Sequence, residues 1–274
     1  MFTAGQVMMR VYINGIGLIA PGLEGLFATQ PALLGEVDWQ YYPLSNHVVE
    51  MLPLNERRRT TPLIKLALNT CKLAIDDAGV QAEYLASVFA SSYGDFEIIH
   101  KLCQALCEKE KFISPTLFHN SVHNASAGYW AIAANSHAPS SSISAADASF
   151  AAGILESVTQ VITNRSDLLL VSYDYPPPEP LDKKCTITMP FGLAFILSTT
   201  SSDSTRACLH IDPEGFINTQ TKPTICQNLS LEQLRGTNPT AKSLPLLECI
   251  CRKQSRDIVL PYIDNSNIIV HIET

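Results

Sequence analysis

The run Asp167–Tyr173 (DLLLVSY) limits the possible folds more than any other segment of the chain. It is apolar at consecutive positions, so as a strand it would be buried on both faces, inside a sheet that helices cover. Strands and helices alternate up to about residue 200, which favours an α/β layered fold. The strands expected in this region are Val11–Ile19, Tyr84–Ala90, Pro139–Ala146, Asp167–Tyr173 and Thr186–Leu197.

Capping residues mark the helices expected between these strands. The first expected helix runs from a Thr60 or Thr61 cap to Gly79. The second begins at an Asp95 cap and carries an apolar stripe of Ile99, Leu102, Cys103 and Leu106. Two more helices are expected from Ser114 to about Asn135 and from about Ala148 to Asn164. Cys103 and Cys107 lie four residues apart on the second helix, where we expect two buried, small apolar side chains.

The last third of the chain predicts less regular structure. The stretch from Ser198 to Pro245 is rich in Thr, Ser, Asn, Pro and Gln, and only Ala207–Ile211 resembles a strand. A short helix at Leu246–Arg252 and a last strand at Asn267–Ile272 follow.

Charge and composition exclude several classes of function. The 19 Lys and Arg residues against 26 Asp and Glu give a formal net charge of −7, which argues against a nucleic-acid binder. Only 16% of residues are charged while 46% are hydrophobic, so apolar surface should remain for a subunit contact. No run of 18 apolar residues predicts a membrane span, and the N-terminus does not resemble a signal peptide. We therefore expect a cytoplasmic chain.

No metal or cofactor motif is evident in the sequence. The eight cysteines show neither a CxxC pair nor a Cys/His zinc spacing. His119 and His123 have the i,i+4 spacing of metal ligands, but the glutamate of an HExxH motif is missing and polar packing at an interface is favoured. No GxSxG elbow, phosphate loop or GxGxxG turn occurs. We expect no metal and no cofactor.

Five sequence segments occur in a consistent order. They are Val11–Pro21 (VYINGIGLIAP), Ala74–Gly79 (AIDDAG), Asn124–Gly128 (NASAG), Ala138–Ser140 (APS) and Ser144–Ser149 (SAADAS). Together they resemble the opening strand, the first helix and the nucleophile region of the β-ketoacyl synthase family. The resemblance implies a thiolase-like layered fold with a truncated C-terminal half. It implies one domain over 1–274, with about 11–200 matching the N-terminal half and about 201–274 as the reduced remainder.

The chain departs from this family at the residues that carry its chemistry. Asp147 stands where the resemblance places the nucleophilic cysteine, and a carboxylate cannot form the acyl thioester. We expect Asp147 to be the N-cap of the following helix instead. The two histidines of the family's C-terminal half also lack counterparts, because only His210 and His271 follow His137, and neither lies in a matching motif. We therefore expect no catalytic residue.

A family member without nucleophile and histidines resembles the chain-length factor of type II polyketide synthesis, most closely the short form of aryl polyene clusters. This implies a Cys-containing ketosynthase partner and a tunnel for a polyketide chain bound to acyl carrier protein. The candidate gate residues of that tunnel are Phe112, Leu117 and Phe118. The candidate residues of the subunit interface are His119, Asn120, His123, Asn124, Ser142 and Ser144. Two alternatives stay open: a degenerate enzyme, either a decarboxylase or an acyltransferase, that uses Asp147 on its own, and a free acyl-binding scaffold protein.

Overall fold

Nine strands form one mixed sheet in the part of the chain that this computed structural model describes, residues 9–45, 48–211 and 221–274. The strands are β1 (Met9–Ala20), β2 (Leu23–Glu24), β3 (Ala86–Ala90), β4 (Ser140–Ile143), β5 (Leu168–Asp174), β6 (Phe191–Ser198), β7 (Ala207–Ile211), β8 (Arg256–Pro261) and β9 (Asn267–Glu273). Their order across the sheet is β4-β3-β5-β6-β1-β7-β9-β8, and β2 pairs with β1. β4, β3 and β5 are parallel, whereas the other pairs are antiparallel.

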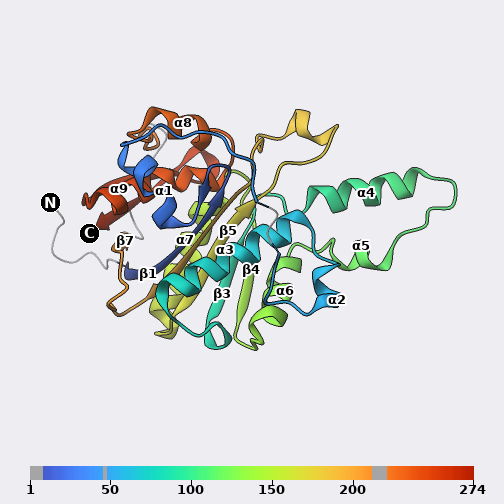
Figure 1. Ribbon diagram of the computed structural model, residues 1–274, viewed down its shortest axis with the longest axis horizontal. Coiled ribbons are helices and arrows are strands. Elements are labelled where there is room, and N and C mark those ends of the chain that lie inside the picture. The colour runs from blue at the N-terminus through green and yellow to red at the C-terminus, as the bar shows by residue number, and fades with distance from the viewer. Residues whose placement is uncertain (1–8, 46–47, 212–220) are drawn as a thin grey trace.

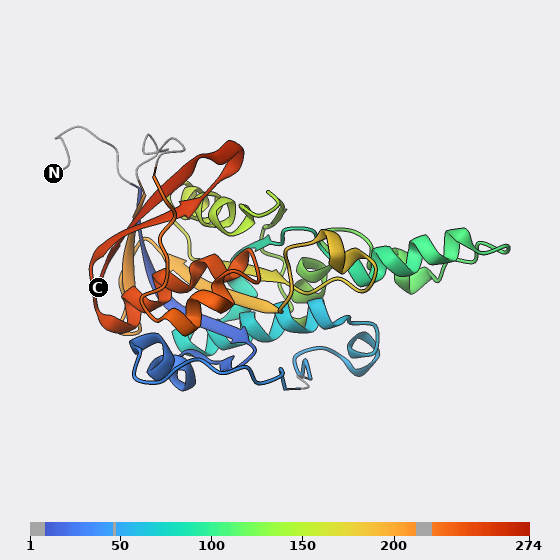
Figure 2. The same cartoon turned by 90° about the horizontal axis from the view of Figure 1, so that it is seen from above.

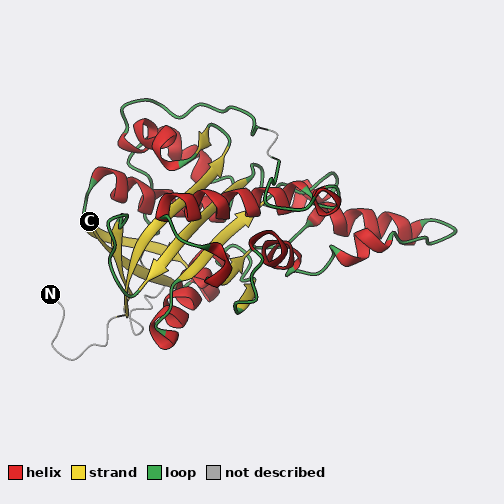
Figure 3. Ribbon diagram, turned by 60° about the horizontal axis from the view of Figure 1, so that its bottom comes forward, coloured by secondary structure: helices red, strands yellow, loops and turns green. Residues whose placement is uncertain are grey.

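Helices cover both faces of this sheet (Figures 1 and 3). They are α1 (Leu26–Leu34), α2 (Leu54–Arg57), α3 (Pro62–Ala78), α4 (Phe96–Cys107), α5 (Pro115–His119), α6 (Ala125–Ala134), α7 (Ser149–Asn164), α8 (Leu229–Arg235) and α9 (Leu244–Arg252). α3 and α6 pack with one face of the sheet in one hydrophobic core, and α1, α7, α8 and α9 pack with the other face in a second core. The α/β layered arrangement expected from the sequence is confirmed. None of the helices in the described ranges is long and apolar enough to cross a membrane.

α3, the first of the helices expected from the sequence, follows the prediction closely. The Thr61 hydroxyl accepts a hydrogen bond from the Ile64 N–H, Pro62 occupies the first turn, and Gly79 ends the helix in the left-handed conformation with a φ of 67°. The motif residue Asp77 then joins three segments. Its carboxylate accepts a hydrogen bond from the Ile16 N–H of β1 at 2.9 Å and forms an ion pair with Arg206 at 2.5 Å. The AIDDAG segment therefore fixes α3 against β1.

The strand expected at β5 is confirmed, whereas the bounds of β4 and β6 are corrected and β8 is new. All seven residues of β5 are buried, as the DLLLVSY run predicts. The strand expected at Pro139–Ala146 is limited to β4, and the one expected from Thr186 begins only at Phe191, after Pro190. β8 was missed, although its buried Ile258 and Leu260 alternate with more exposed residues as a half-buried strand requires.

Candidate functional site

The position that the family resemblance assigns to a nucleophile lies in the turn between β4 and α7. Ala146 in this turn has a positive φ of 47°. The Ser149 hydroxyl accepts a hydrogen bond from the Ala145 N–H at 2.9 Å and donates one to the Ala146 carbonyl at 2.7 Å. Ser149 therefore closes the turn, and Asp147 lies half-buried beside it.

The expected N-cap role of Asp147 is wrong. The N-cap of α7 is Ala148, and no side chain caps the helix. Asp147 precedes the N-cap by one residue, and its Oδ1 accepts a hydrogen bond from the Thr186 hydroxyl at 3.3 Å instead. The sequence placed the helix start one residue too early, so the carboxylate holds a neighbouring loop and not the helix.

We expect Asp147→Ala to change the free energy of unfolding by less than about 0.5 kcal/mol, because the polar contacts that it removes are partly exposed. The matched control is Thr61→Ala, which removes a true cap of α3 and should cost about 1 kcal/mol. Urea unfolding followed by circular dichroism measures both values. A loss at Asp147 equal to that at Thr61 would contradict the assignment.

Hydroxyl and amine groups surround Asp147. Burial raises the pKa of the Tyr93 phenol, and the charges of Asp147 and Cys185 raise it further. Burial also lowers the pKa of Lys242, a shift that the nearby Asp147 carboxylate opposes. The thiol of Cys185 thus lies on this side of the molecule, yet it follows a short 3-10 helix and not the start of α7, whose N–H groups would favour a thiolate. These groups can bind polar atoms, but they contain no histidine–thiolate pair.

A buried carboxyl that the sequence reasoning missed lies close by at the end of β5. Asp174 is 1% exposed and accepts four hydrogen bonds: from the N–H and the hydroxyl of Ser92, from the Ser91 hydroxyl and from the Thr240 hydroxyl. Burial raises the pKa of Asp174 to about 7 in spite of these donors. The signal in the sequence was a single acidic residue directly after an apolar strand. If Asp147 acted on its own as an acid or base, its carboxyl would need burial in an apolar pocket. The fully buried carboxyl of this region is that of Asp174.

Two of the predicted interface residues support the turn that holds Asp174. The Ser144 hydroxyl donates a hydrogen bond to the Ser92 carbonyl at 2.7 Å. The His123 Nε2 lies 3.1 Å from the Ser91 carbonyl oxygen. Ser144 and His123 thus connect the nucleophile-position turn and the α5–α6 connection to one buried polar cluster.

An arm formed by α4 and α5 projects from the body of the molecule (Figures 1 and 2). The sequence predicted one helix from Ser114 to about Asn135, and this is wrong, because α5 ends at His119 and α6 begins at Ala125. The break follows from the side chain of Asn120, which donates to the Arg59 carbonyl at 2.8 Å and accepts a hydrogen bond from the Tyr129 hydroxyl at 3.2 Å. These contacts fold the chain back onto the body at this point.

The expected burial of Cys103 and Cys107 is also wrong, since both thiols are exposed. Ile99 and Leu106 of the same apolar stripe are 40% and 52% exposed. α4 is amphipathic as the sequence predicts, but no layer of the described part of the chain packs against the outer part of the arm. The stripe is therefore an apolar surface without a partner among the residues that the structure describes.

An apolar cavity of about 530 Å³ lies where α5 and α6 meet. Its lining residues are Pro115, Phe118, His119, Val122, Asn124, Ala125, Gly128, Tyr129 and Ile132. Phe118, Val122 and Ile132 are each at least half exposed around it. Of the three gate candidates, Phe118 lines this cavity, Leu117 is half-buried outside its lining, and Phe112 is exposed near the tip of the arm.

The six predicted interface residues differ in their place and in their exposure. His119 and Asn124 are exposed beside the cavity, and Ser142 and Ser144 lie on β4 and directly after it. His123 is half-buried. The interface role expected for Asn120 is corrected. Asn120 is only 2% exposed, and its side chain makes its hydrogen bonds within this chain.

His119 and His123 do not converge as metal ligands. The His119 Nδ1 lies 3.1 Å from the Asn120 Oδ1, whereas His123 contacts the Ser91 carbonyl. Within the described ranges, the group of three residues with metal-ligand geometry lies elsewhere, on β7 and β9.

The comparisons with known proteins agree on one fold. The model of the beta-ketoacyl synthase N-terminal domain matches residues 36–258. A chain from the ketosynthase ApeO in complex with its chain length factor ApeC, from Xenorhabdus doucetiae, superposes with a TM-score of 0.70 and 24% identity, over 96% of this chain and 99% of that chain. The ishigamide ketosynthase/chain length factor superposes with a TM-score of 0.71 at 11% identity, over the same shares of the two chains.

The ketosynthase from module 1 of the bacillaene synthase of Bacillus amyloliquefaciens FZB42 gives a TM-score of 0.56 at 14% identity. The superposition covers 79% of this chain but only 47% of that ketosynthase. No curated protein sequence matches the chain. The structure thus has the thiolase-like ketosynthase fold and corresponds to about half of a full-length ketosynthase, as the family resemblance implied.

Proposed function

The chain belongs to the β-ketoacyl synthase family, and from this premise we propose that it is the non-catalytic chain-length-factor subunit of a two-subunit ketosynthase. It pairs with a Cys-containing ketosynthase in the cytoplasm and shapes the tunnel for an aryl polyene-like chain bound to acyl carrier protein. The observation that carries this proposal is the apolar arm, whose α4 stripe and α5–α6 cavity have no partner among the described residues. A subunit contact is the physical use of such a surface.

The non-catalytic role rests on the chemistry at the nucleophile position. Asp147 cannot accept an acyl group as a thioester. Thr186 donates a hydrogen bond to Asp147, and the charge of Asp147 affects the pKa values of Tyr93 and Lys242. None of these three side chains is an imidazole, the group that would stabilise an enolate in a condensing site. Similar folds in complexes that contain a ketosynthase and a chain length factor support the same role.

The interface that we propose consists of the arm and β4. β4 pairs with β3 on one side and is an edge strand in the described part of the chain, so its free edge can pair with a strand of the partner. Ser142 on this strand, together with Ser144, His119, His123 and Asn124 nearby, is proposed to lie in the contact.

Co-expression with the proposed Cys-containing ketosynthase partner should give a one-to-one complex on size-exclusion chromatography with mass detection. Ile132→Asp places a charge on the apolar surface and should weaken the complex at least about thirtyfold, the effect of losing a central interface side chain. The matched control is Leu229→Asp, an exposed leucine on α8 outside the arm, which should leave the complex intact. A monodisperse chain that does not bind the ketosynthase would support a free scaffold protein and overturn the proposal.

Phe118 is the gate residue that the cavity favours. Phe118→Ala should lengthen the products by two-carbon units and Phe118→Trp should shorten them, because a rigid polyene cannot overlap a packed wall. Mass spectrometry of carrier-bound products from the complex measures the distribution. Phe112→Ala and Leu117→Ala test the other two candidates, and Leu229→Ala on α8 is the control. If the complex assembles and Phe118→Ala leaves the products unchanged, the gate lies elsewhere.

A further inference from the structure

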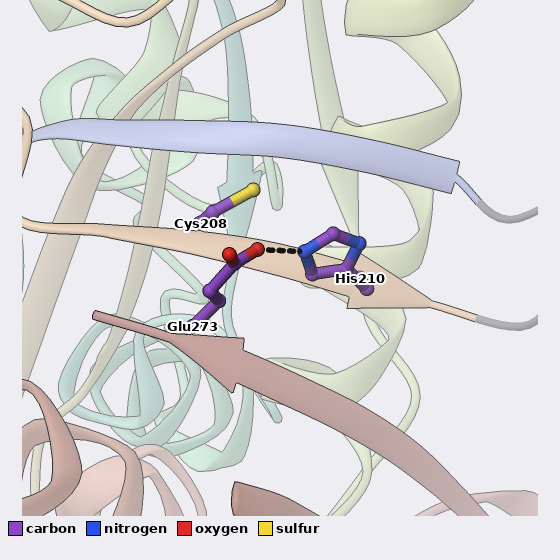
Figure 4. A group of neighbouring side chains, drawn as sticks. All are labelled: Cys208, His210 and Glu273. Carbon is purple, nitrogen blue, oxygen red and sulfur yellow. Dashed lines mark hydrogen bonds and ion pairs between the residues drawn. The ribbon is translucent and has the colours of Figure 1, made fainter. Parts of the chain in front are cut away.

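Three potential metal ligands meet on the sheet (Figure 4). They lie on β7 and β9, at the end of the molecule opposite the arm (Figure 1). Cys208 and His210 belong to β7, and Glu273 belongs to β9. One ligand atom from each, the Sγ, a ring nitrogen and a carboxylate oxygen, lies within 4.8 Å of the other two. The His210 Nε2 and the Glu273 Oε2 are 2.9 Å apart.

The strand register explains why these residues meet. Cys208 and His210 are two residues apart, so they project from the same face of β7. Cys208 lies directly opposite Glu273 in the antiparallel ladder, and His210 lies opposite His271. Facing positions in such a pair bring side chains into contact. The site is therefore built by the regular sheet and needs no loop to form.

We propose that Cys208, His210 and Glu273 form a binding site for a divalent transition-metal ion of the zinc class. Thiolate sulfur, imidazole nitrogen and carboxylate oxygen are the ligand types that Zn²⁺ takes in proteins, and three protein ligands leave one position for water. Cys208 is 5% exposed and Glu273 is 54% exposed, so an ion would enter from the carboxylate side. Binding would replace the thiol proton of Cys208, which is released to solvent.

Arg10 on β1 is the competitor for this site. Its Nε donates a hydrogen bond to the Cys208 Sγ at 3.1 Å, and its guanidinium lies 3.8 Å from the Glu273 carboxylate. The Arg10 side chain is 52% exposed, so it can turn to solvent when an ion takes its two partners. Next to the site, the His271 Nδ1 of β9 lies 2.7 Å from the Asp257 Oδ1 of β8. This contact holds β8 and β9 together.

The ion would join β7 to β9 and so fix the last strand to the sheet. This role is independent of the proposed chain-length function. It also differs from the sequence expectation of no metal, because the Cys208–His210 spacing fits no zinc motif and Glu273 is distant in the sequence.

The test uses the full chain with Cys103→Ser and Cys107→Ser, which removes the exposed thiols of α4 as background ligands. After stripping with a chelator, Co²⁺ is titrated as a spectroscopic probe and Zn²⁺ by competition with a chromogenic chelator. We expect one equivalent of Co²⁺ with a sulfur-to-metal charge-transfer band and a rise in melting temperature on addition of Zn²⁺.

Cys208→Ser should abolish the charge-transfer band, and His210→Ala should lower the affinity for Zn²⁺ at least about tenfold. Arg10→Gln should retain the band and bind Zn²⁺ more tightly. Cys226→Ser, a buried thiol outside the site, is the control and should change neither readout. The absence of a charge-transfer band, or a band that survives Cys208→Ser, would overturn the proposal.

Discussion

Gly17→Ala should destabilise the protein more than any other single methyl addition discussed for this chain. A Cβ at residue 17 would lie 2.1 Å from the Thr70 carbonyl oxygen and 2.8 Å from the Ala74 nitrogen. Both are backbone atoms of α3, so no side chain can move aside, and the helix would have to leave β1. Overpacking a tight core costs about 1–3 kcal/mol, and we expect about 3 kcal/mol or more here because a whole helix is displaced. Urea unfolding of the purified variant measures the loss.

Gly236→Ala is the matched control for this substitution. The atoms nearest to its added Cβ are 3.6 Å and 3.9 Å away, and Gly236 has an ordinary φ of −74°. Alanine should therefore be neutral or stabilise by up to about 1 kcal/mol, because it restricts the unfolded chain. Equal effects of the two substitutions would show that α3 does not contact β1 as described.

Asp174→Asn should remove a pH dependence from the stability of the protein. The pKa of Asp174 is raised to about 7 by burial, against about 3.9 for an ordinary aspartate. Between these values the folded state holds a proton that the unfolded state has released, so the stability falls as the pH rises. The contribution is complete below about pH 4 and is lost as the pH passes 7. It amounts to about 3 kcal/mol between pH 5 and pH 8.

The measurement compares the free energy of unfolding of the wild type and of Asp174→Asn at pH 5, 6, 7 and 8. Asparagine keeps the shape and one oxygen for the Ser92 N–H, and its amide can donate to the hydroxyls of Ser92 and Thr240. Taking the difference between the two proteins cancels the other titrating groups. A difference that stays constant with pH would contradict the prediction.

The sequence predicted the elements whose local signals agree with their tertiary roles. In α3, the Thr61 cap, Pro62 and Gly79 act over one or two turns, so they specify the same helix in any context. The apolar run of β5 needs burial on both faces, and only the interior of the sheet offers it. The glycines of β1 follow the same logic, because α3 packs directly on their backbone.

The sequence failed where contacts distant along the chain decide the outcome. The amphipathic stripe of α4 predicts an apolar partner but not whether that partner belongs to the same chain. The break after α5 depends on the contact of Asn120 with Arg59, 61 residues away. At Asp147, a shift of one residue in the start of α7 turned an expected cap into a loop contact.

The sequence by itself determined the layered α/β class and the family resemblance, and it led us to expect Asp147 in place of the nucleophile, because each depends on residue type at a local position. Only the tertiary structure decided which apolar surface stays exposed and which polar groups meet. The buried cluster of Asp174, Ser91, Ser92 and Thr240 joins three segments, and the Cys208–Glu273 pair joins two strands. The physical reason is that strand pairing and burial bring together residues whose distance along the chain carries no local signal.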